Sequence, residues 1–109
     1  MNRKIQLLLL ALVVMLGVSG VVAQDTVTLT YLVDESQNSQ DSAAALAAAY
    51  MAMNPNVEIV IESRPGGTDG DNLVKTRLAT GDMTDIFWYN SGSLLQALNP
   101  TQTLVDISD

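Results

Sequence analysis

The chain has 109 residues, with 5 basic and 12 acidic side chains, no histidine and no cysteine. Its net charge of −7 disfavours nucleic acids and anionic membrane surfaces as partners, because both are polyanions. Without histidine or cysteine, these residues cannot form a histidine-based triad, a thiol nucleophile or a disulfide. The fold must therefore depend on an apolar core.

Residues 1–23 are typical of an export signal. A positive start is followed by an almost wholly apolar stretch, and Ala23 supplies the small residue that a signal peptidase needs. An uncleaved membrane anchor is the alternative, since about 20 apolar residues span a bilayer, but two glycines near the end of the stretch argue against it. We expect residues 24–109 to be a soluble periplasmic or secreted protein. It would not be inserted in the membrane, and without cysteine it would not be a lipoprotein.

The first predicted strand covers residues 26–33, which are rich in β-branched and aromatic side chains. Its last residues are apolar on both faces, which suits the middle of a parallel sheet. The polar residues 34–41 predict a loop, and a helix is expected over 43–53. The N-cap candidates are Ser39, Asp41 and Ser42, and one helix face carries Leu46, Ala49, Tyr50 and Met53.

The rest of the chain predicts a strand, a helix, a strand and a short helix, over residues 57–62, 72–80, 85–89 and 94–98. The first of these strands has a mixed outer face, which indicates a position near the edge of the sheet, and the second is expected to be buried. Gly81 is a natural stop for the helix before it, and Asn99-Pro100 is expected to end the last helix. The order β-α-β-α-β-α predicts an α/β fold with a mostly parallel sheet and right-handed crossovers.

Three strands and three short helices leave sheet edges and helix faces bare, which is a liability in a finished protein. We therefore expect the chain to be the N-terminal part of a longer one. A self-sufficient small exported α/β protein is the alternative.

Two sequence motifs carry a resemblance to a known family. Residues 54–59 place Asn-Pro-Asn between a helix and a strand, and residues 79–88 have the form A-x-G-x-x-x-D-hydrophobic-x-W. Together with the predicted strand after the signal and the C-terminal segment LNPTQTLVDISD, these motifs resemble the extracellular solute-binding proteins of ABC importers. The resemblance is to the sugar-binding group in particular, which includes maltose-binding protein. The similar stretches, in family order, are residues 26–33, 47–62, 73–93 and 98–109.

Family members are several times longer and have two lobes, so the resemblance implies that residues 24–109 form an incomplete N-terminal part of lobe 1. Thr84 stands where the family often has proline, a difference confined to a turn. The resemblance implies a substrate-binding component that captures a solute, a sugar or oligosaccharide, and delivers it to ABC permease subunits in the membrane. The residues themselves contain no recognisable catalytic set, and we expect no enzymatic activity, no cofactor and no metal.

Ligands of open α/β sheets gather at the carboxyl ends of the strands. Those ends are residues 34–37, 63–65 and 89–91 here, and the resemblance points to the first and third. Sugars are bound by planar hydrogen-bonding groups and by aromatic faces. The candidate ligand-binding residues are Asp34, Glu35, Gln37, Trp88, Tyr89, Asn90 and Ser91. The alternatives are a merely solvated loop for Asp34 and Glu35, and a core position for Trp88.

Other charged residues have simpler interpretations. Arg64 is expected to be a solvated loop residue, and Asp85 to organise its own turn. Asp69 and Asp71 flank a glycine as in part of a calcium loop, but the remaining ligand positions are missing. With Thr68 they are therefore N-cap candidates for the second helix. An exported enzyme, such as a glycosidase with catalytic residues beyond Asp109, is the alternative function.

Overall fold

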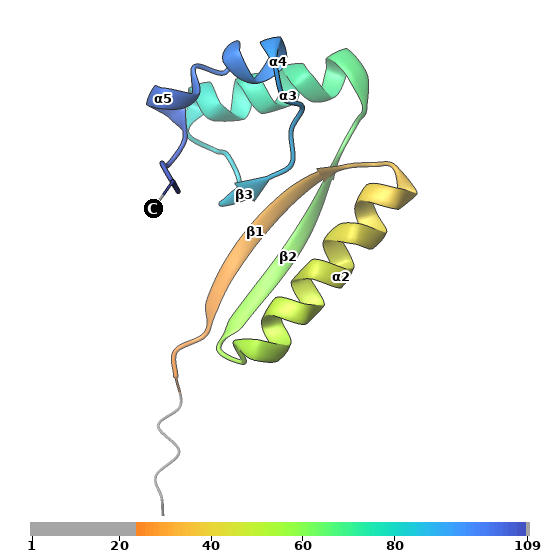
Figure 1. The fold of residues 1–109 in the computed structure, drawn as a ribbon, viewed down its shortest axis with the longest axis vertical. Coiled ribbons are helices and arrows are strands. Elements are labelled where there is room, and N and C mark those ends of the chain that lie inside the picture. The colour runs from red at the N-terminus through yellow and green to blue at the C-terminus, as the bar shows by residue number, and fades with distance from the viewer. Residues whose placement is uncertain (1–23, 109) are drawn as a thin grey trace, which may run out of the picture.

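The computed structural model describes residues 24–108, so the predicted export signal lies outside the described residues (Figure 1). The elements are β1 (Val27–Asp34), α2 (Gln37–Met53), β2 (Val57–Arg64), α3 (Gly67–Thr80), β3 (Ile86–Phe87), α4 (Ser93–Gln96) and α5 (Pro100–Thr103). The predicted alternation of strands and helices is confirmed, with α5 as an addition. Within residues 24–108, no helix has the length and apolar character that crossing a membrane requires.

The sheet is parallel, in the order β2-β1-β3. The central place of β1 and the edge place of β2 agree with the sequence prediction. The β1–β2 ladder runs from Val27 opposite Val57 to Asp34 opposite Arg64. By contrast, β3 pairs with β1 at two positions only.

Strand β3 is shorter and more exposed than the strand predicted over residues 85–89. A carboxylate oxygen of Asp85 accepts hydrogen bonds from the Thr30 backbone N–H and from the Thr30 hydroxyl, both at 2.8 Å. The Thr30 backbone N–H, which a longer β1–β3 ladder would use, is therefore bonded to the Asp85 side chain. As a result, β3 begins only at Ile86. Ile86 is 42% exposed, so the prediction of a buried strand is wrong.

Helix α2 begins well before residue 43, so the predicted loop over 34–41 is reduced to Glu35 and Ser36, and the predicted N-caps Ser39, Asp41 and Ser42 are wrong. Ser36 is the N-cap, and its hydroxyl accepts from the backbone N–H of Ser39 at 3.4 Å. A serine N-cap satisfies one of the unpaired N–H groups at the helix start, which lets polar residues form the first turns. The helix ends at Met53 with Asn54 as its C-cap, as the Asn-Pro-Asn sequence predicted.

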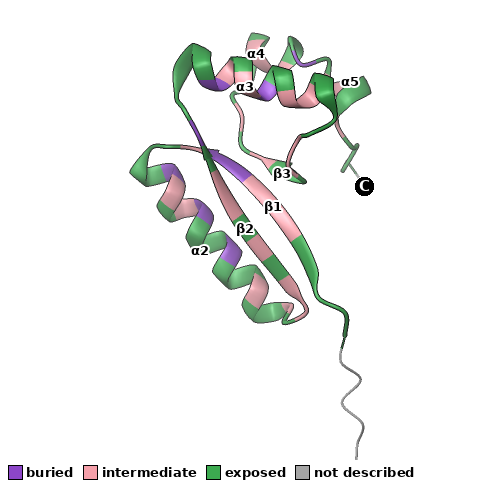
Figure 2. Cartoon of the chain, turned by 180° about the vertical axis from the view of Figure 1, so that it is seen from behind, coloured by how far each residue is buried: buried purple, intermediate pink, exposed green. Residues whose placement is uncertain are grey.

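The face of α2 that is buried on β1 and β2 differs from the apolar face seen in the sequence. The buried residues are Ser39, Ala43 and Ala47, which form a stripe along the helix in Figure 2. Leu46 and Met53 are 63% and 75% exposed. Small side chains at four-residue intervals bring the helix axis close to the sheet, and the larger side chains lie beside that contact.

On the other side of the sheet, α3, α4 and α5 gather around β3 (Figure 1). Leu32 of β1, Val74 of α3 and Leu98 form the buried cluster that joins them. Helix α3 begins at Gly67 with Gly66 as its N-cap, so none of the three predicted caps is correct. Gly81 ends α3 in the left-handed conformation, as predicted. Pro100 is the first residue of α5 and not simply the end of a helix, because proline suits a first turn.

Candidate functional site

The carboxyl ends of the three strands meet at one edge of the sheet. The Trp88 backbone N–H donates to the Leu32 carbonyl at 2.8 Å, which places the residues after β3 against the end of β1. An Arg64 guanidinium N–H donates to the Trp88 carbonyl at 3.4 Å, and Glu35 accepts from the Gly66 backbone N–H at 3.3 Å. We refer to these three chain segments, residues 34–37, 63–66 and 88–91, as the strand-end site.

Both carboxylate oxygens of Asp34 accept hydrogen bonds from residues at the start of α2. One carboxylate oxygen accepts from the Ser36 backbone N–H at 2.9 Å, and the other accepts from the Ser39 hydroxyl at 2.7 Å. The hydrogen bonds from Ser36 and Ser39, with a smaller contribution from the positive charge of Arg64, lower the pKa of Asp34 to about 2. Asp34 is therefore an ionised acceptor held in a defined position, unlike the freely solvated loop residue of the alternative interpretation.

We expect Asp34→Asn to lower the free energy of unfolding at pH 7 by about 1 kcal/mol, since solvent screens this partly exposed group. The pKa in the folded chain lies below the usual value of 3.8. The carboxylate therefore stabilises the fold above pH 4, and this stabilisation is lost as the pH falls toward 2. Urea unfolding of the wild type and of Asp34→Asn between pH 7 and pH 2.5 measures the difference in their free energies of unfolding. The exposed Asp25→Asn is the control, and a difference that stays constant across this range would contradict the prediction.

The polar side chains near Asp34 differ in their exposure and in their hydrogen-bond partners. Glu35 is exposed at the strand-end site. Gln37 lies in the first turn of α2, where its exposed side-chain amide donates to Asp41 at 2.8 Å. Gln40, which the sequence did not single out, donates to the Asp34 carbonyl at 2.7 Å and to the Ser63 hydroxyl at 3.3 Å. If the sequence analysis had started this helix at Gln37, helical periodicity would have predicted that Gln40 faces the sheet.

The third segment brings aromatic groups to the site. Trp88 is 42% exposed, so the alternative of a core position is wrong. The Tyr89 ring is half-buried and lies edge-on to Phe87, with 6.2 Å between ring centroids. Its hydroxyl is buried without a hydrogen-bond partner among residues 24–108. Burial, followed by the nearby Asp71 carboxylate, raises the pKa of Tyr89.

Asn90 and Ser91 are exposed and line a hollow of about 590 Å³ that extends away along β3. Most of its other lining side chains are apolar, including Leu78, Met83 and Ile107. These two polar candidates of the strand-end site therefore also form part of the wall of this hollow.

Two charged residues differ from their sequence interpretation. Arg64 is 5% exposed and not a solvated loop residue. Asp85 does not organise its own turn: its partner is Thr30 of β1. The Thr30 backbone N–H, and then the hydroxyl, hold the pKa of Asp85 below its usual value. Sequence spacing could not show either contact, because both join segments far apart in the chain.

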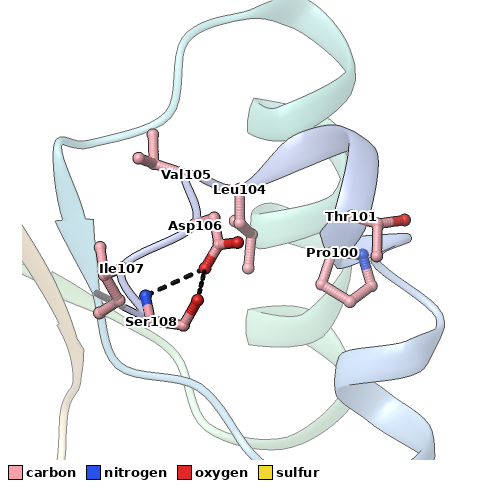
Figure 3. Close-up of a pocket in the computed structure, with 7 residues that line it drawn as sticks. All are labelled: Pro100, Thr101, Leu104, Val105, Asp106, Ile107 and Ser108. Carbon is pink, nitrogen blue, oxygen red and sulfur yellow. Dashed lines mark hydrogen bonds between the residues drawn. The ribbon is translucent and has the colours of Figure 1, made fainter.

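A second hollow lies near the carboxyl end of the described residues. It has a volume of about 490 Å³ and is lined by residues around α5 and the segment after it (Figure 3). Its one carboxylate, Asp106, already accepts from the Ser108 backbone N–H and hydroxyl at 3.0 and 2.6 Å. Residues 24–108 contain no group of three or more acidic side chains placed to hold a metal.

Neither a family model nor a curated protein matches the sequence. Among solved structures, the fold is similar to that of an extracellular solute-binding protein family 1 from Alicyclobacillus acidocaldarius subsp. acidocaldarius DSM 446. The likeness has a TM-score of 0.52 at 23% sequence identity and covers 60% of this chain and 16% of that chain. It establishes a shared fold for this part of the molecule, and the chain spans only a small share of that protein's length.

Proposed function

We propose that this chain forms the start of the first lobe of an exported solute-binding protein of an ABC importer. The observation that carries the proposal is the meeting of three parallel strand ends at one edge, where ligands of open α/β sheets bind. The shared fold with a solute-binding protein supports it. Closure of a second lobe over this edge is the expected mechanism.

A neutral polyhydroxylated solute, such as a sugar or oligosaccharide, is the ligand class that we propose. Asp34 offers an oriented carboxylate for ligand hydroxyl groups, and Trp88 offers an exposed aromatic surface for a sugar's C–H patches. Glu35, Gln37, Tyr89, Asn90 and Ser91 complete the proposed contacts. The proposal includes removal of residues 1–23 on export and delivery of the solute to permease subunits.

The test is calorimetric titration of the exported full-length protein with glucose, maltose, maltotriose, spermidine and glutamate. We expect one of the three saccharides to bind, and Trp88→Ala to weaken this binding by about tenfold or more, since loss of an aromatic platform costs on the order of 1–3 kcal/mol. Tyr50→Ala is the matched control, because Tyr50 is 45% exposed on α2, away from the site. The mass of the purified protein shows whether it begins at Gln24.

Binding of no saccharide would contradict the proposed ligand class. Equal losses in the Trp88 and Tyr50 variants would contradict the proposed place of binding. A protein that still carries residues 1–23 after export would contradict the cleavage.

A further inference from the structure

We propose that Arg64 is a positioning residue that holds Trp88 and Tyr89 in the geometry that ligand binding needs. This inference rests on the proposed function of the strand-end site. Arg64 is the last residue of β2 and is 5% exposed, although its guanidinium is always charged. A charged side chain is seldom buried to this extent unless specific partners hold it.

The partners of Arg64 are main-chain carbonyls. One guanidinium N–H donates to the Pro65 carbonyl at 3.2 Å, and another donates to the Trp88 carbonyl at 3.4 Å. Arg64 forms no ion pair within 4.0 Å among the described residues, where the pair seen is Arg77 with Glu62 at 2.7 Å. The guanidinium therefore joins the end of β2 to the residue that follows β3.

The link matters because the ladder of β3 is so short. Past Phe87, the pairing with β1 is continued among residues 24–108 by a single hydrogen bond, from the Trp88 N–H to the Leu32 carbonyl. The Arg64 bond to the Trp88 carbonyl fixes the same peptide segment from the side of β2. Trp88 is thus held by its main chain on both sides while its indole stays exposed.

Arg64 also fixes the next residue. Its guanidinium carbon lies 5.6 Å from the centroid of the Tyr89 ring, over the ring face, within the range of a cation–π interaction. Phe87 meets the same ring edge-on. Gly70 of α3 leaves the space for this arrangement, because a Cβ atom there would overlap both the Pro65 carbonyl and the Arg64 guanidinium.

A lysine cannot reproduce this arrangement. Its ammonium group can reach one carbonyl, but it has no planar group to cover the Tyr89 ring while bonding two segments. A methionine keeps much of the apolar stem and removes all the donors. Arg64→Lys therefore tests whether positive charge and side-chain length are enough, and Arg64→Met tests the loss of all the hydrogen bonds and of the charge.

The test labels the full-length protein with 5-fluorotryptophan and follows the ¹⁹F resonance of Trp88, identified by its loss in Trp88→Phe. In ligand-free protein we expect Arg64→Met to move and broaden this resonance, with a smaller effect in Arg64→Lys. Calorimetric titration with the saccharide that binds the wild type is expected to show about tenfold weaker binding in Arg64→Met. Arg77→Met is the matched control, because it removes the partly exposed pair with Glu62.

An unchanged Trp88 resonance and affinity in folded Arg64→Met would overturn the inference. If Arg64→Met does not fold, Arg64→Lys decides by the same two measurements. If no saccharide binds the wild type, the proposed function fails, while the ligand-free resonance still tests whether Arg64 holds this segment. A resonance that moves without any change in a measurable affinity would overturn the link between the held segment and binding.

Discussion

Replacing Leu32 with alanine is expected to lower the free energy of unfolding by about 2–5 kcal/mol, the usual cost of removing a buried leucine side chain. Leu32 is 1% exposed and packs with Val74 and Leu98, so it joins β1 to the helices on the β3 side of the sheet. The truncation leaves a cavity where β1 meets α3, and rigid main chain on both sides limits its collapse. Urea unfolding followed by circular dichroism measures the change.

Leu46→Ala is the matched control for this prediction, because it removes the same atoms from a side chain that is 63% exposed on α2. We expect a change within about 0.5 kcal/mol. Comparable losses in the two variants would contradict the assignment of the buried face of α2 to its alanine stripe.

Gly70→Ala is expected to lower the free energy of unfolding by about 1–3 kcal/mol, as overpacking of a filled site usually does. In an open helix position the same change stabilises by about 1 kcal/mol, because alanine has the higher helix propensity. Here the new methyl group would overlap the Pro65 carbonyl, which is main chain, and the Arg64 guanidinium. The steric cost therefore opposes and exceeds the gain in propensity.

Thr76→Ala in the same helix is the control, since Thr76 is exposed and the change there should be neutral or slightly stabilising. Thermal unfolding of both variants gives the comparison. A Gly70→Ala protein as stable as the wild type would show that α3 can move away from the end of β2.

Much of the architecture could be predicted from the hydrophobic pattern and from local signals that end helices. Apolar residues on both faces marked β1 as the central strand, and Gly81 marked the end of α3. Helix starts were harder, because the first turns of α2 consist of polar residues whose N–H groups are satisfied locally by Ser36. The buried face of α2 was misjudged because residue hydrophobicity favoured Leu46, while close approach to the sheet selects small residues such as Ala43.

The site could be predicted in outline but not in its connections. Strand ends place Asp34 and Trp88 at one edge by topology, and the structure brings their segments together there. The burial of Arg64 depends on contacts with Pro65, Trp88 and Tyr89, which only the assembled sheet creates. No local pattern around residue 64 contains that information.

The unequal ladders of the sheet also set an order of assembly. Strands β1 and β2 pair along their full length, and the segment that separates them is a single helix whose own hydrogen bonds form locally. Closing that loop costs less chain entropy than bringing in β3, which lies 55 positions from its partner and adds only two paired positions. We expect β1, α2 and β2 to form the folding nucleus. The residues that follow β3, Trp88 among them, then belong to the part of the molecule that docks last and opens first.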